Sequence, residues 1–220
     1  MTYLLSDPDS VVADTVSHWL VDYVGRPHPL LGRDGPVCPF VIPALKAGSL
    51  SVRQHRWRGQ PDISRMAGLI DAILDHFHAS VPDARPGDLH TLVVPVIGLP
   101  GSAWWLIDDG HRRAKTRVAA RGYMLGQFHP ACTEPAVHNA LFPVNRAPYP
   151  LFAVRPMALH DLLFLHEDPI WFEQYRQRFG HRYHGGGRVS PQLRGLYSAA
   201  SRQYGCRQPA EFSAATEGRS

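Results

Sequence analysis

The sequence contains little cysteine and no long apolar run. Its three cysteines, Cys38, Cys132 and Cys206, are odd in number and far apart, so they do not indicate the disulfide framework of a small secreted domain. No apolar run reaches the roughly 20 residues that a transmembrane helix needs. Acidic residues near the N-terminus stand where a secretory signal would need a cationic segment. We therefore expect a cytoplasmic protein with reduced cysteines and no membrane partner.

Lysine is also scarce: Lys46 and Lys115 are the only two. The remaining basic residues are arginines spread along the chain, and they give a net charge of +4. No basic stripe interleaved with aromatic residues is present, which argues against a nucleic-acid partner.

Several motifs of common enzymes are missing as well. The chain has no Gly-x-Gly-x-x-Gly before a helix, no Gly-x-x-x-x-Gly-Lys, no His-Glu-x-x-His and no Cys-x-x-Cys. These absences remove most of the support for nicotinamide chemistry, nucleotide triphosphate hydrolysis and a zinc finger.

The residues that are present predict an α/β or α+β fold. Apolar residues recur at helical spacing in 8–24, 62–81, 102–122, 159–180 and 190–205. Apolar strand-like runs lie near residues 50, 95, 125 and 153. Helices that alternate with strands predict a single-domain sandwich, with a small central sheet flanked by helices. We place this domain at residues 1–208 and a flexible C-terminal tail at 209–220.

The segment 126–150 holds four candidate metal ligands, His129, Cys132, Glu134 and His138, among five prolines. Their spacings match no established zinc or non-haem iron site, so a crowded turn is the alternative interpretation. Taken alone, His129 ends a predicted strand before a stiffening proline and has apolar neighbours. A haem iron needs one such fixed imidazole, whereas the other interpretation is a core histidine bonded to the backbone.

Two arginines follow this segment. Haem propionates need cationic partners, and Arg146 and Arg155 are candidates. Arg155 interrupts an apolar strand, where its burial would be costly without a partner, but it could also be an exposed strand end. His181 and His184 precede three glycines, where they could carry a ligand or simply end a helix.

The motifs "GQFHP", "FPVNRAPYPLFAVRPMALHD" and "SRQYG" resemble a family of bacterial biosynthetic-cluster proteins. That family in turn resembles the YqcI/YcgG proteins, some of which are haem-dependent enzymes that N-oxygenate amino acids. The resemblance covers roughly residues 27–205. The chain departs from YqcI/YcgG at Phe128, where they have leucine, and at Val-Arg-Pro, where they have Asn-Pro-His.

The resemblance implies haem b, with His129 as the iron ligand. It also implies Arg155 and Tyr204 as pocket residues, and we add Phe128 and Arg146 to the cofactor-binding set. His160, Glu134 and Arg155 are the candidate catalytic residues, with His160 or Glu134 relaying protons. Trp104, Trp105 and Tyr149 are candidate pocket walls.

The expected function is that of a haem-dependent monooxygenase of secondary metabolism. Its substrate would be a small amine or amino acid, oxidised at nitrogen or carbon, and a homodimer is compatible with this function. Two alternatives stay open: a non-haem metal enzyme centred on residues 129–138, and a small-ligand binding protein without turnover.

Overall fold

The computed structural model describes residues 3–82, 85–184 and 189–205. The chain divides into two compact units, Met1–Ala158 and Leu159–Ser220, and each is described by itself. The single domain over residues 1–208 stays a prediction, and the tail at 209–220 lies outside the described residues. Within the described part of the chain, no helix has the length and apolar character that a bilayer crossing demands.

The first unit is built on a mixed five-stranded sheet. Its strands are β1 (Leu50–Val52), β2 (His55–Arg56), β3 (Thr91–Ile97), β4 (Tyr123–Phe128) and β7 (Leu151–Pro156). The order is β1-β3-β7-β4, and β2 also pairs with β3. β1 and β2 run parallel to β3, whereas β3–β7 and β7–β4 are antiparallel. The predicted fold class, a small central sheet flanked by helices, is confirmed.

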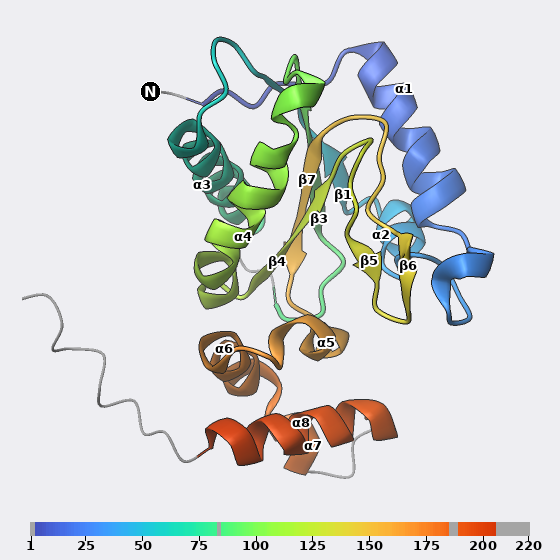
Figure 1. The fold of residues 1–220 in the computed structure, drawn as a ribbon, viewed down its shortest axis with the longest axis vertical. Helices are drawn as coiled ribbons and strands as arrows, with labels where there is room; N and C mark the ends of the chain where they lie inside the picture. The colour runs from blue at the N-terminus through green and yellow to red at the C-terminus, as the bar shows by residue number, and fades with distance from the viewer. Residues whose placement is uncertain (1–2, 83–84, 185–188, 206–220) are drawn as a thin grey trace, which may run out of the picture. The chain divides into compact units, whose positions relative to one another are not determined.

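Helices cover both faces of this sheet (Figure 1). α3 (Ile63–Ser80) and α4 (Trp105–Ala120) lie on one face, and α1 (Ser10–Trp19) and α2 (Val41–Lys46) lie on the other. Alternation along β7 serves both faces, because Phe152 and Val154 join the core under α3 and α4, whereas Leu151 joins the core under α1. Each strand residue is thereby assigned to one face.

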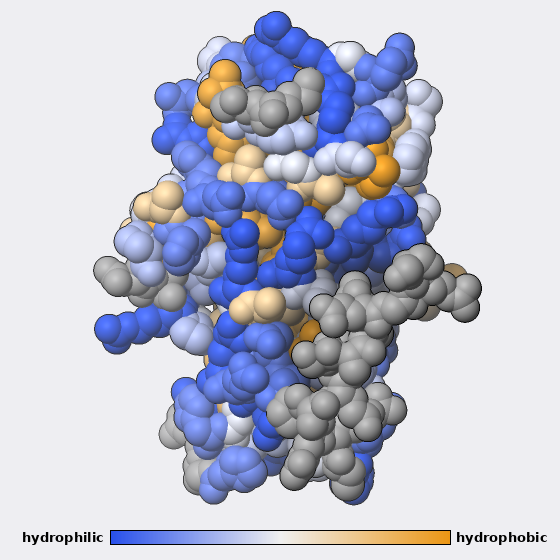
Figure 2. Space-filling view, turned by 90° about the vertical axis from the view of Figure 1, so that its left-hand side faces the viewer, coloured by the Kyte–Doolittle hydropathy of each residue, from blue (hydrophilic) through white to orange (hydrophobic). Residues whose placement is uncertain are grey.

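The outer surfaces of α3 and α4 are polar. Figure 2 looks onto the side of the molecule that carries these helices, and hydrophilic residues cover much of it. Arg117 pairs with Asp71 at 3.1 Å and Arg121 pairs with Asp75 at 2.6 Å, so two ion pairs connect the helices across this surface. An apolar inner face and a charged outer face are what the helical periodicity predicts.

The segment between β4 and β7 is more ordered than the sequence indicated. It contains a hairpin of β5 (Pro135–Ala136) and β6 (Asn139–Pro143). Phe142 is buried and stacks on His28, with 4.3 Å between the ring centroids. The hairpin is therefore held by packing against residues that lie about a hundred positions earlier, which local sequence patterns do not reveal.

The second unit is helical in its described part. It contains a short 3-10 turn (Leu159–Asp161), α5 (Leu162–Leu165), α6 (Pro169–Phe179), α7 (His181–His184) and α8 (Pro191–Tyr204). Asp168 caps α6 and Ser190 caps α8, and each cap is followed by a proline at the first helical position. The three glycines after His184 lie outside the described residues.

Candidate metal centre

Three potential metal ligands meet at the edge of the sheet that β4 forms. Asp108 lies in the first turn of α4, and His129 directly follows the last residue of β4. The backbone amide of Cys132 donates to the carbonyl of His129 at 3.0 Å, so a tight turn brings the cysteine back towards the histidine. A short turn joins the end of α4 to the start of β4, and the two elements pack side by side. The start of α4, which carries Asp108, therefore lies near the end of β4.

The donor atoms of this cluster are close together. His129 Nε2 lies 3.0 Å from Asp108 Oδ2, and Cys132 Sγ lies 4.0 Å from Asp108 Oδ1. One ligand atom from each residue lies within 4.8 Å of the other two. In a tetrahedral zinc site with bonds of about 2.0–2.3 Å, donor atoms lie roughly 3.5 Å apart. A small closing movement would therefore allow the three residues to bind one ion.

Burial differs among the three residues. His129 and Cys132 are 5% and 1% exposed, whereas the Asp108 side chain is 45% exposed. His129 Nδ1 is buried and has no hydrogen-bond partner. Leaving such an atom unpaired costs about 1–3 kcal/mol, so it requires an explanation. A ligand bound at Nδ1 is one explanation, while the carboxylate of Asp108 bonds the other ring nitrogen, Nε2.

Electrostatics keep the thiol protonated when no ion is bound. Burial raises the pKa of Cys132, and the carboxylates of Asp108 and Glu134 raise it further. A backbone hydrogen bond with Glu134 and the charge of Arg146 offset part of this rise. A nucleophilic cysteine needs the opposite, a lowered pKa, so the cluster does not resemble a thiolate catalyst. A metal ion would deprotonate the thiol on binding.

A fourth titratable group, His111, follows Asp108 by one turn of α4. Burial lowers the pKa of His111 to about 4, and the charge of Lys115 adds to this effect. A backbone hydrogen bond with Leu125 acts in the opposite direction. His111 is thus neutral near pH 7, and a backbone hydrogen bond already engages its ring.

Arg155 and Phe128, two residues expected beside His129, lie on the other face of the sheet. Arg155 pairs with Met124 across the two strands, five residues before His129, which corresponds to about 16 Å along β4. Its guanidinium lies 4.4 Å from the ring of Phe40, and it donates to the carbonyl of Pro156 at 2.9 Å. Phe128 packs edge-on against Trp19. Neither residue shares the environment of Asp108.

Other predicted residues lie nearer to the cluster. Glu134 and Arg146 are exposed, and both act on the charge state of Cys132. The ring of Trp104 lies 5.8 Å from that of His129, and its buried Nε1 also has no partner. Trp105 is 53% exposed on the first turn of α4.

The remaining predicted residues lie elsewhere. Tyr149 belongs to the core under α1, and His138 is exposed in the turn between β5 and β6. His160 and Tyr204 belong to the second unit. His160 is exposed there, and Tyr204 donates to the carbonyl of Glu167 at 2.7 Å.

Sequence reasoning missed Asp108. It occurs in "LIDDG" within a segment correctly expected to be helical, 21 positions before His129. No spacing rule connects these positions, and only the packing of α4 on β4 brings them together. An aspartate in the first turn of an otherwise apolar helix start was the available signal, but it equally fits a favourable interaction with the helix dipole.

The fit to haem can be judged from these placements. His129 Nε2 is engaged by Asp108 and its Nδ1 is buried, while Arg155 and Phe128 lie across the sheet. These three expected residues do not line one haem pocket, so we derive no step through haem. Haem stays a prediction of the resemblance.

Comparison with known proteins gives a family but no activity. The profile of a family described as a domain of unknown function (DUF6875) matches residues 13–189. The chain belongs to this family. No curated protein and no solved structure matches the chain. The DUF6875 match includes Asp108, His129 and Cys132 and extends into the second unit. The relation to YqcI/YcgG stays a prediction.

Proposed function

We propose that Asp108, His129 and Cys132 bind one divalent transition-metal ion and that the chain is a metal-dependent enzyme. The observation that supports this most directly is the meeting of three different donor types within 4.8 Å, two of them buried. The buried, unpartnered Nδ1 of His129 adds to it, because a histidine that ligates through one nitrogen usually bonds a carboxylate through the other. If the ion is bound through Nδ1, Asp108 orients the imidazole; if it is bound through Nε2, which lies 3.0 Å from Asp108 Oδ2, Asp108 is itself a ligand.

Zinc is the ion that this donor set fits best. Thiolate, imidazole and carboxylate are the three ligand types of protein zinc sites, and three protein ligands with an open fourth position are typical of catalytic zinc. The thiolate and the carboxylate together neutralise the two charges of the ion. The site would thus carry no net charge in its resting state, and its burial would cost less than that of a charged centre.

The exposure of Asp108 indicates where a substrate would approach. His129 and Cys132 close the inner side of the cluster, whereas the carboxylate faces solvent. The ion would supply a polarised water or a polarised substrate oxygen at that side. Exposed Glu134 is suited to accept a proton there, and exposed Arg146 is suited to pair with a substrate carboxylate. The proposed substrate is a small amine or amino acid.

Haem-dependent N-oxygenation, which the resemblance implies, is the competing proposal. One feature favours it, because a carboxylate-paired histidine at a strand end is also a suitable axial ligand for iron. The two proposals share His129 and differ in Cys132 and Asp108, which haem does not need as ligands.

We also propose a cytoplasmic location. Cys38 and Cys132 are both free thiols, and a thiolate ligand is preserved best in a reducing compartment. Measuring the fraction of chain in cytoplasmic and membrane fractions of the native host would test this.

The test is elemental analysis combined with absorption spectroscopy of the purified chain. We expect zinc at one ion per chain and no Soret band. In Asp108→Asn, His129→Ala and Cys132→Ser, zinc affinity should fall by about 100-fold or more in the last two and about 10- to 100-fold in the first. His138→Ala and Cys38→Ser are the matched controls, because they remove the same donor types outside the cluster.

Cobalt substitution provides a second readout that does not depend on activity. Co²⁺ in the site should give a thiolate charge-transfer band that disappears in Cys132→Ser and persists in Cys38→Ser. Retention of full zinc affinity in both His129→Ala and Cys132→Ser would overturn the metal site. A Soret band that depends on His129 but not on Cys132 would favour haem instead.

A further inference from the structure

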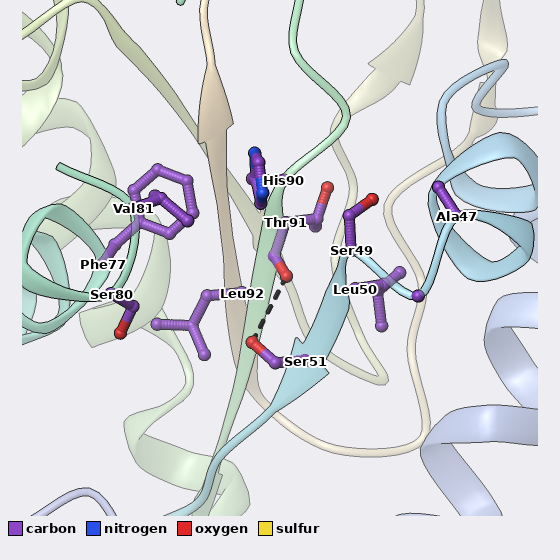
Figure 3. A pocket seen from close by; sticks show the side chains of 11 residues that line it. Ala47, Ser49, Leu50, Ser51, Phe77, Ser80, Val81, His90, Thr91 and Leu92 are labelled. Atoms are coloured by element: carbon purple, nitrogen blue, oxygen red, sulfur yellow. Dashed lines mark hydrogen bonds between the residues drawn. The ribbon is translucent and has the colours of Figure 1, made fainter. Parts of the chain in front are cut away.

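A second site lies at the opposite edge of the sheet, where β1 meets the end of α3. A half-open cavity of about 280 Å³ is lined there by the turn before β1, the last turn of α3 and the start of β3. Figure 3 shows side chains from all three segments around this cavity. One water molecule occupies about 30 Å³ in the liquid, so the cavity has room for a ligand of small-fragment size.

Hydroxyl groups supply most of the polar lining, and their protons are already donated to backbone carbonyls. Ser80 Oγ donates to the carbonyl of His76 at 2.8 Å, and Ser49 Oγ can donate its proton to the carbonyl of Ala44 at 3.2 Å or to that of Leu89 at 3.3 Å. Thr91 Oγ1 donates to the carbonyl of Leu89 at 3.2 Å. Because each hydroxyl has one proton and two lone pairs, these groups can offer a ligand only acceptor sites.

Ser51 extends this pattern, and His90 adds an unsatisfied atom. Ser51 Oγ donates to the carbonyl of Thr91 in a long contact of 3.5 Å, drawn in Figure 3. His90 also lines the cavity, and its Nδ1 is buried with no hydrogen-bond partner. Because solvent does not reach this nitrogen, it is not part of the surface that a ligand in the cavity would contact.

The rest of the lining is apolar. It consists mainly of Phe77, Val81, Leu50 and Leu92, and no aspartate, glutamate, lysine or arginine is among the lining residues. An aromatic ring and aliphatic groups beside several acceptors suit a molecule with a cationic donor head and an apolar body. A carboxylate would instead meet mainly hydroxyl lone pairs, with the imidazole of His90 as the one side-chain N–H donor among the lining residues.

We propose that this cavity is a binding site for a small primary ammonium compound with an apolar body. The ammonium group has three donors and no acceptor, which matches a lining that offers acceptors and no free hydroxyl proton. The apolar body would lie against Phe77 and Leu92. The expected order of affinity is ammonium, then alcohol, then carboxylate.

This cavity is distinct from the metal cluster. Thr91 begins β3, whereas His129 follows β4, two strands away at the other edge of the sheet. β4 ends opposite Leu151, which pairs with Pro95 near the far end of β3 from Thr91. A ligand in the cavity therefore does not reach the cluster, and the proposal does not depend on the metal.

The test uses three probes of similar size, benzylamine, benzyl alcohol and benzoate, titrated into the full chain at pH 7. Two-dimensional NMR of the labelled protein reports both affinity and location. We expect benzylamine to bind about tenfold more tightly than benzyl alcohol, with shifts centred on residues 47–51, 77–81 and 90–92, and no benzoate binding there. Equal affinity for all three probes, or strongest binding of benzoate, would overturn the proposal.

Variants separate the cavity from the rest of the surface. Ser80→Phe should fill the cavity from the exposed end of α3 and abolish binding, whereas Ala79→Phe, an exposed neighbour outside the lining, should leave it unchanged. Thr91→Val keeps the shape and removes an acceptor, so it should weaken benzylamine about threefold to tenfold. Thr15→Val is its control, since that hydroxyl also donates to a backbone carbonyl. Unchanged benzylamine binding in Ser80→Phe contradicts the assignment.

Discussion

Each unit contains a small group of buried polar side chains, and the two groups differ in their hydrogen bonding. In the second unit, the hydroxyl of Tyr175 donates to the carbonyl of Leu159 at 2.7 Å and lies 2.7 Å from the hydroxyl of Tyr183. In the first unit, His129 bonds Asp108 through Nε2 and leaves Nδ1 buried without a partner.

This difference separates a structural group from a candidate site. Tyr183 stacks on Tyr197 with 3.9 Å between the ring centroids, so aromatic packing adds to the satisfied hydrogen bonds. Burial raises the pKa of Tyr175, which keeps its hydroxyl neutral at all ordinary pH values. A complete group of this kind needs no ligand. In the group around His129, the Nδ1 atom still lacks a partner.

The largest effect is expected from removing the centre of the complete group. Tyr175 is fully buried, so Tyr175→Ala should lower the free energy of unfolding by about 3–5 kcal/mol through lost packing and unpaired polar atoms. Urea unfolding measures this change, and zinc content measures the other group. We expect zinc content per folded chain to stay at the wild-type value. Its loss in this variant would show that the two groups are not independent.

A smaller effect, on the pH dependence of stability, is expected from His111 in the first unit. The pKa of His111 is lowered to about 4, whereas an unfolded histidine titrates near 6.5. Between these values the unfolded chain binds a proton that the folded chain does not, so stability rises with pH across this window and is complete above it. The contribution of His111 to the free energy of unfolding should therefore fall by about 2 kcal/mol between pH 7 and pH 4.5.

His111→Gln tests this contribution, because glutamine can still donate to the backbone but does not titrate. Its free energy of unfolding should fall less than that of the wild type over the same pH change. His18→Gln, at an exposed helix position, should retain the wild-type pH dependence. A His111→Gln variant with the full wild-type acid sensitivity would exclude His111 as the cause.

The smallest effect is expected at Tyr204, which the resemblance assigns to the cofactor pocket. Its hydroxyl donates to the carbonyl of Glu167 within the second unit, on a side chain that is not fully buried. Tyr204→Phe should cost at most about 1 kcal/mol in unfolding free energy and should not change zinc content. A selective loss of a Soret band in this variant would restore Tyr204 to a haem site.

Local patterns were enough to find the longest helices and the central strands. The apolar periodicity of 62–81 and the run at 89–98 became α3 and β3, because an amphipathic helix and a buried strand are encoded over a few turns or residues. Pro169 begins α6, because the missing backbone N–H of proline is tolerated at the first helical position. The hairpin at 135–143 was missed because its packing partners lie about a hundred residues earlier.

The sequence by itself determined the fold class and the position of His129 at the end of a strand, since strand ends and proline exits can be read locally. Only the tertiary structure decided the partners of that histidine. It placed Asp108 beside it through the packing of α4 on β4, and it placed Arg155 on the opposite face because side chains alternate along a strand. Both outcomes depend on strand pairing and helix docking between distant segments, and neither is encoded in the spacing of the residues themselves.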